Sequence, residues 1–128
     1  MFEAQLLNAG SEVFSPWFPR GGDNLKATLD VIEWDATGGA VTLTVDVYTK
    51  SSETPGNGAI ADNSGPPPGS QIKVLSSDTP ATGRFSDVWP VGLTPGINEL
   101  VRYKFKVDNG DSVLFRMLPA VWFDSVNP

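Results

Sequence analysis

Apolar and polar residues alternate along several short runs of this chain, and this two-residue period constrains the fold more than any other feature. In the run 25–32, apolar residues occupy every odd position, and polar residues occupy every even position except Ile32. The runs 41–48, 101–107 and 112–118 have the same period. Successive side chains of a strand point to opposite faces, so each run predicts a β-strand with at least one buried face. No window of ten residues has apolar residues at helical spacing.

The residues between these runs predict how the strands pair. The segment 35–39, Asp-Ala-Thr-Gly-Gly, favours a turn that would join 25–32 and 41–48 as an antiparallel hairpin. Asn109-Gly110 favours a type I′ turn that would join 101–107 and 112–118 as a second hairpin. The run 112–118 is apolar on one face and on much of the other, which predicts a central strand covered on both sides. Shorter strands are expected at 2–7, 12–14, 71–75 and 83–89.

Chain length and the number of short strands predict the architecture. A chain of 128 residues fits one domain, 1–128, which buries about two-thirds of the unfolded surface. Thirteen Gly and eleven Pro punctuate seven or eight short runs. The predicted fold is therefore all-β, an antiparallel two-sheet β-sandwich of jelly-roll or immunoglobulin-like type. A small β-barrel is the alternative.

Composition excludes several classes of function. The net charge of −6 argues against nucleic acid as a partner, because phosphate binding needs excess cations. The sequence has no His and no Cys, so it lacks a catalytic triad, thiol chemistry and the usual zinc ligands. A carboxylate pair such as Glu33 and Glu99 is the remaining catalytic candidate. We expect a protein that is not an enzyme and uses no cofactor.

The N-terminal sequence shows no secretory signal, because it has neither a basic start nor a long apolar run. No stretch approaches the roughly 18 apolar residues of a membrane span. The sequence does not define the compartment. A virion or a cytoplasmically made assembly is the expectation that fits the remaining sequence features.

The segment 51–70 is rich in Gly, Pro and Ser and has no strand or helix pattern. Long loops of this kind in small domains are usually functional or disordered. Pro66, Pro67 and Pro68 favour an extended polyproline II conformation, which a neighbouring subunit could capture at low entropic cost. Two interpretations follow: an arm that clasps another subunit, or a mobile loop.

Aromatic residues provide the candidate contact sites. Trp17 and Phe18, with Arg20 nearby, would suit a protein interface if exposed. Trp17, Trp89 and Tyr48 are the candidates for stacking on a sugar ring, since Trp17 and Trp89 stand beside prolines at expected strand ends. For any single Trp, packing in the core is the commoner role. Trp34 and Trp122 are expected to close the two ends of the core.

Charged residues provide two further candidates. Arg102, Lys104 and Lys106, called here the basic row, would lie on one face of a strand with Arg116 opposite, and could orient a docking surface. The alternative, which we favour, is that Asp30, Glu33 and Asp46 pair with these cations across the sheet. Asp108 and Asp111 form a weak calcium candidate, but Asn109-Gly110 already explains that turn without a metal.

Together these features predict a non-catalytic structural protein that self-assembles or decorates a larger assembly, with other protein subunits as partners. A virus-particle accessory or decoration subunit, or another shell or appendage subunit, would fit. The alternative is a carbohydrate-binding or adhesion module that uses exposed aromatic rings and has a glycan as its partner.

Overall fold

The computed structural model describes residues 5–8, 10–36, 40–53, 55–56, 58–61, 72–77, 82–90, 97–108 and 112–124. Over these residues the chain forms strands and no helix, as the two-residue period predicts. The strands in chain order are β1 (Gln5–Asn8), β2 (Glu12–Phe14), β3 (Phe18–Pro19), β4 (Asn24–Asp35), β5 (Thr42–Lys50), β6 (Ala59–Ile60), β7 (Ile72–Leu75), β8 (Gly83–Trp89), β9 (Leu100–Asp108), β10 (Ser112–Met117) and β11 (Val121–Phe123).

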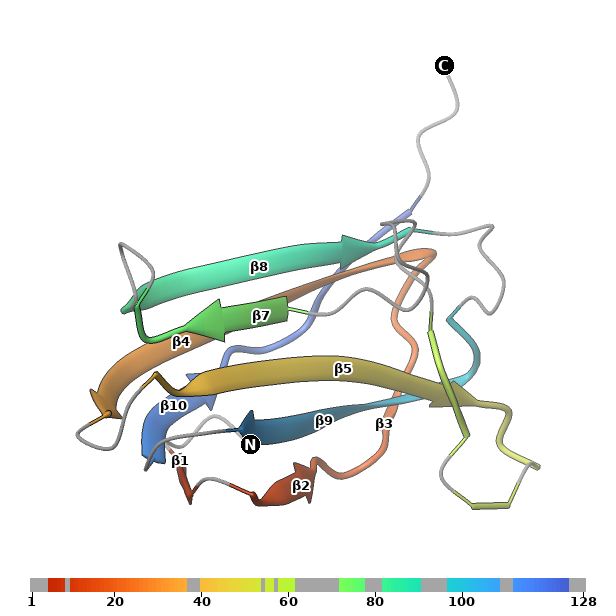
Figure 1. The fold of residues 1–128 in the computed structure, drawn as a ribbon. Helices are drawn as coiled ribbons and strands as arrows, with labels where there is room; N and C mark the ends of the chain where they lie inside the picture. Colours follow the sequence, from red (N-terminus) through yellow and green to blue (C-terminus); the bar gives the residue numbers. More distant parts are fainter. Residues whose placement is uncertain are drawn as a thin grey trace.

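The strands form two antiparallel sheets that face each other (Figure 1). In sheet A, β10 and β11 pair with one edge of β4, β8 pairs with its other edge, and β1 pairs with β10. In sheet B, β9 pairs with β5, while β2 and β3 pair with the other edge of β9. β6 and β7 complete sheet B along β5.

The strand order is that of a jelly roll. Four antiparallel pairs nest within one another along the chain: β1 with β10, β2 with β9, β4 with β8 and β5 with β7. Such nested pairing of eight main strands in two sheets defines the jelly-roll form of the β-sandwich. The predicted all-β, two-sheet fold is confirmed, and its connectivity matches the first of the two expected forms.

The two predicted hairpins are wrong. β4 and β5 belong to different sheets, and so do β9 and β10. In a jelly roll a turn between consecutive strands can carry the chain across from one sheet to the other, so a turn sequence alone does not define a hairpin. Asn109 and Gly110 lie outside the described residues. β10 is central in sheet A as expected, but Leu114 and Arg116 on its outer face are half-buried, so its two-sided cover is incomplete.

The hydrophobic core lies between the two sheets. Inward-facing side chains of β4, such as Leu25 and Leu29, meet those of β5 and β9, and each is almost completely buried. Burial of such a side chain contributes about 1.5–3 kcal/mol. Trp34 and Trp122 pack partly buried against this core from opposite ends of β4, as expected.

The structure describes part of the segment 51–70, and that part is not structureless. Strand β6 pairs with the end of β5, and Ala61 beyond it is fully buried. Gly58 has a φ of 72°, and a side chain there would collide with the Thr49 carbonyl group, so this position requires glycine. Pro66, Pro67 and Pro68, the residues of the predicted arm, lie outside the described residues.

Candidate functional site

A polar groove runs across the outer face of sheet B. Its floor comes from β5, where odd-numbered residues such as Leu43 and Val45 point into the core and even-numbered residues point outward. The outward side chains Thr42, Thr44 and Asp46 are only 8, 8 and 9% exposed. Polar side chains on an outer face are usually well exposed, so their low exposure shows that they lie at the bottom of a depression.

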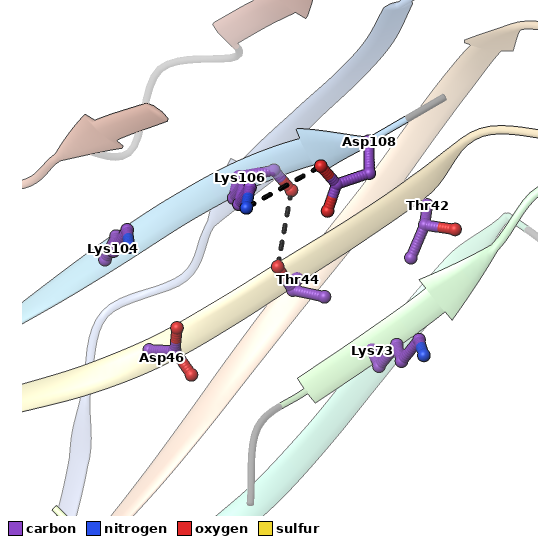
Figure 2. A pocket seen from close by; sticks show the side chains of 7 residues that line it. All are labelled: Thr42, Thr44, Asp46, Lys73, Lys104, Lys106 and Asp108. Atoms are coloured by element: carbon purple, nitrogen blue, oxygen red, sulfur yellow. Dashed lines mark hydrogen bonds and ion pairs between the residues drawn. The ribbon is translucent and has the colours of Figure 1, made fainter. Parts of the chain in front are cut away.

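The strands on both sides of β5 provide the walls of this groove (Figure 2). Lys73 of β7 and Lys106 of β9 lie on either side of Thr44 in the strand register. The groove holds about 500 Å³, a volume within the range of small-molecule sites. Its lining is polar and charged throughout: Thr42, Thr44, Asp46, Lys73, Lys104, Lys106 and Asp108.

A shared carboxylate holds the lysines of β9 in place. Glu12 of β2 lies 3.6 Å from the Lys104 ammonium group and 3.8 Å from that of Lys106. Lys106 also lies 3.7 Å from Asp108, and the Thr44 hydroxyl donates a long hydrogen bond of 3.5 Å to the Lys106 carbonyl oxygen. The groove wall is therefore an ion-pair network and not a set of isolated charges.

The predicted basic row is confirmed as a row on one face of β9, but its expected ion-pair partners are only partly correct. Asp30 and Glu33 lie on β4 in sheet A, and the Asp30 carboxylate accepts a 3.1 Å hydrogen bond from Arg116. Arg116 therefore belongs to the other sheet and does not face the row. Asp46 does lie opposite Lys104 in the register of β5 and β9.

Aromatic rings and cations form a ladder beside the groove. The Arg102 guanidinium lies 3.9 Å from the ring centre of Phe14 and 4.6 Å from that of Trp17. Lys50 lies 4.7 Å from the same Trp17 ring. At the groove end of the ladder, Tyr48 meets Phe14 edge-to-face at 5.5 Å between ring centres. Each such contact contributes about 0.5–2 kcal/mol and fixes the rings in position.

The residues predicted to stack on sugars occupy three different environments. Trp89 is fully buried and its indole N–H donates a 3.2 Å hydrogen bond to the Ala61 carbonyl, so the prediction that it is exposed is wrong. Trp17 is half-buried in the cation–aromatic ladder. Tyr48 lies two residues beyond Asp46 on the same face of β5, which places it next to the groove.

The candidate interface residues Trp17, Phe18 and Arg20 are all half-buried. Phe18 packs on Tyr103 at 5.3 Å between ring centres and against the core. The Arg20 guanidinium donates hydrogen bonds to the carbonyl oxygens of Gly22 and Ile97 and lies 3.4 Å from Asp23. Arg20 therefore joins two segments of its own chain.

The outer face of sheet A differs in composition. It carries two apolar patches, the Leu6 patch (Leu6 and Leu114) and the Val121 patch (Leu118, Pro119 and Val121). Ile32 and Phe123 are further exposed apolar side chains of the same sheet. Leu6 is 66% exposed and Val121 52% exposed. Each patch borders a hollow, of about 360 Å³ and about 510 Å³ respectively. Between them, Arg116, Asp30 and Arg84 lie side by side across three strands and form a charged belt.

The carboxylate side chains and the buried Tyr103 hydroxyl are the groups to consider for metal binding and for acid–base chemistry. The described residues contain no cluster of three or more His, Cys, Asp or Glu side chains suited to a metal ion. Asp108 of the weak calcium candidate pairs with Lys106, whereas Asp111 lies outside the described residues. Burial raises the pKa of the Tyr103 hydroxyl well above its usual range, but this group faces the core and not the groove.

Comparison with known proteins adds no relative: no protein-family model, no curated protein and no solved structure matches the chain. In the described segments there is no helix long and apolar enough to cross a membrane.

Proposed function

We propose that this chain is a non-catalytic structural subunit that self-assembles or decorates a larger protein assembly, for example the shell of a virus particle. The jelly roll is a common fold of capsid and lectin domains. That likeness is an analogy of fold alone, and a fold does not define a function. The stronger support comes from the surface.

The observation that carries the proposal is the distribution of exposed apolar side chains. Among the described residues, five large hydrophobic side chains are exposed, and four of them lie in sheet A: Leu6, Ile32, Val121 and Phe123. Single exposed hydrophobic residues are common, but contiguous patches beside hollows indicate contact surfaces. A charged belt between the two patches would fix the orientation of a docked subunit.

An edge strand offers a second means of association. Strand β1 pairs with β10 on one side only, and no described strand pairs with the backbone groups of its other edge. A strand from a neighbour can satisfy such groups. Leu6, the most exposed of the five hydrophobic side chains, lies on this strand.

The test is the mass of the purified chain in solution, measured by light scattering across micromolar concentrations. The proposal predicts a defined oligomer whose mass is a whole multiple of 13.7 kDa. A monomer at every concentration would contradict self-assembly and restrict the proposal to decoration of a foreign scaffold. Mixing with that scaffold would then be required for any gain in mass.

A further inference from the structure

We propose that the groove across sheet B binds a neutral oligosaccharide. This inference goes beyond assembly and concerns the opposite face of the sandwich. It does not require stacking by Trp17 or Trp89. It rests on the groove floor, on the charge balance of the lining and on the aromatic residue Tyr48 at one end of the groove.

The groove floor offers hydrogen-bonding groups of both kinds. The Thr42 and Thr44 hydroxyls can donate and accept, the Asp46 carboxylate accepts, and the lysine ammonium groups donate. A sugar hydroxyl also donates and accepts, so it can bridge neighbouring groups of such a surface. Binding pockets for drug-like ligands are mostly apolar, whereas this lining is polar throughout, which favours a ligand covered with hydroxyls.

The charge balance favours a neutral ligand over an anion. Three ammonium groups, of Lys73, Lys104 and Lys106, line the groove, and two carboxylates, of Asp46 and Asp108, line it with them. Glu12 adds a third carboxylate that lies within 4 Å of two of these lysines. An incoming phosphate or sulfate would meet the carboxylates of Asp46 on the floor and Asp108 on the β9 side, and like charges across an interface are costly.

Tyr48 gives the groove an aromatic end. Its side chain follows Asp46 on the same face, and its ring is held edge-to-face by Phe14 at 84° between ring planes. A tyrosine ring has an apolar body and a polar tip, which suits the mixed surface of a sugar ring. The ladder beyond it, from Phe14 to Trp17, keeps this wall rigid before any ligand binds.

The rigidity of the site also supports binding. Thr42, Thr44 and Asp46 lie on a central strand whose residues pair with β9 at every position from Thr42 to Lys50. Side chains on such a strand are already ordered, so little conformational entropy remains to be lost on binding. The site is thus organised by the sheet and not by a loop.

The test is a ¹H–¹⁵N NMR titration of the full chain with maltotriose, cellotriose and N,N′,N″-triacetylchitotriose, and with sodium sulfate as the anionic probe. At least one trisaccharide should shift amide signals of β5, β7 and β9 around the groove. Thr44→Val and Asp46→Asn, which change side-chain size little, should each weaken binding about tenfold. Thr28→Val on sheet A is the matched control and should leave the affinity unchanged.

Several results would overturn the inference. They are the absence of groove shifts with all three trisaccharides, stronger shifts with sulfate than with any saccharide, or unchanged binding in both groove variants. If Asp46→Asn unfolds, Lys73→Met replaces it as the second groove variant, because Lys73 is exposed. The mass of the same samples tests assembly separately, so failure of either proposal can be distinguished from failure of the other.

Discussion

The two outer faces of the sandwich differ more than its two inner faces do. Both sheets turn apolar residues toward the common core. Outside, sheet A carries two apolar patches separated by a charged belt, whereas sheet B carries a polar groove and a cation–aromatic ladder. Formation of the core explains why the inner faces are apolar, but it does not explain the composition of the outer faces. The differences between the outer faces are therefore where the function of this chain is to be sought.

The faces also differ in how they stabilise their charges. On sheet A, Arg116 and Asp30 form a simple pair at 3.1 Å. On sheet B, the Glu12 carboxylate forms ion pairs with two lysines, and the Arg102 guanidinium contacts two aromatic rings. Networks of this kind hold side chains in fixed positions more firmly than single exposed pairs do.

The largest difference in stability is expected between variants of two tryptophans. Trp89 of sheet A points into the core, whereas Trp17 lies outside it beside sheet B. Trp89→Ala should lower the free energy of unfolding by about 3–5 kcal/mol, because it leaves a cavity and an unpaired Ala61 carbonyl. Trp17→Ala should cost about 1 kcal/mol, the value of its cation contacts. Urea denaturation followed by circular dichroism would measure both. Equal losses would contradict the assignment of Trp89 to the core.

A smaller difference in the free energy of unfolding is expected between variants of one arginine from each outer face. Arg102→Met should cost about 1 kcal/mol through lost contacts with Phe14 and Trp17. Arg116→Met should cost about 0.5 kcal/mol, because it removes a partly exposed ion pair. Raising the salt concentration should shrink the Arg116 effect more than the Arg102 effect. Denaturant midpoints at low and high salt would show this, and an identical salt response would remove the proposed distinction.

The smallest effect concerns the core side of sheet B. The Tyr103 hydroxyl is buried and has no hydrogen-bond partner among the described residues. Tyr103→Phe should therefore leave the free energy of unfolding at neutral pH nearly unchanged, because no hydrogen bond is lost.

The pH dependence of the same variant follows from the raised pKa of Tyr103. Below about pH 10 the phenol is neutral in the folded and unfolded chains alike. As the pH rises beyond that value, only the unfolded chain ionises, so the folded state loses relative stability. The original chain should thus lose stability faster than Tyr103→Phe above that pH. If the free energy of unfolding of the two chains fell in parallel with rising pH, ionisation of Tyr103 would not be the cause of the alkaline loss of stability.

The sequence was sufficient to predict the eight main strands, but not the short strands β3, β6 and β11 and not the pairing partners. Alternation in 25–32 and 101–107 depends only on which side chains face the core, and that pattern is local. Pairing depends on which distant strand lies alongside, as when Leu25 of β4 pairs with Trp89 of β8. The turn sequence after Asp35 gave no indication that the chain would cross to the other sheet.

The groove was beyond prediction for a related reason. Its residues come from β5, β7 and β9, which are separated in the chain by long segments. Thr42, Thr44 and Asp46 have the pattern of an ordinary solvent-facing row, and nothing local reveals that they are sunken. The basic row on β9 was visible, but its partner Glu12 comes from a strand some ninety residues earlier.

The most direct test of the division between the two faces is light scattering on three versions of the chain. We expect the original chain to form a defined oligomer, the Leu6→Asp, Val121→Asp double variant to be a folded monomer, and Lys73→Glu on sheet B to keep the original mass. A charge placed in an apolar contact surface opposes association because burying it is costly. An original chain that is monomeric at all micromolar concentrations, or a double variant of unchanged oligomeric mass, would contradict the assignment of association to sheet A.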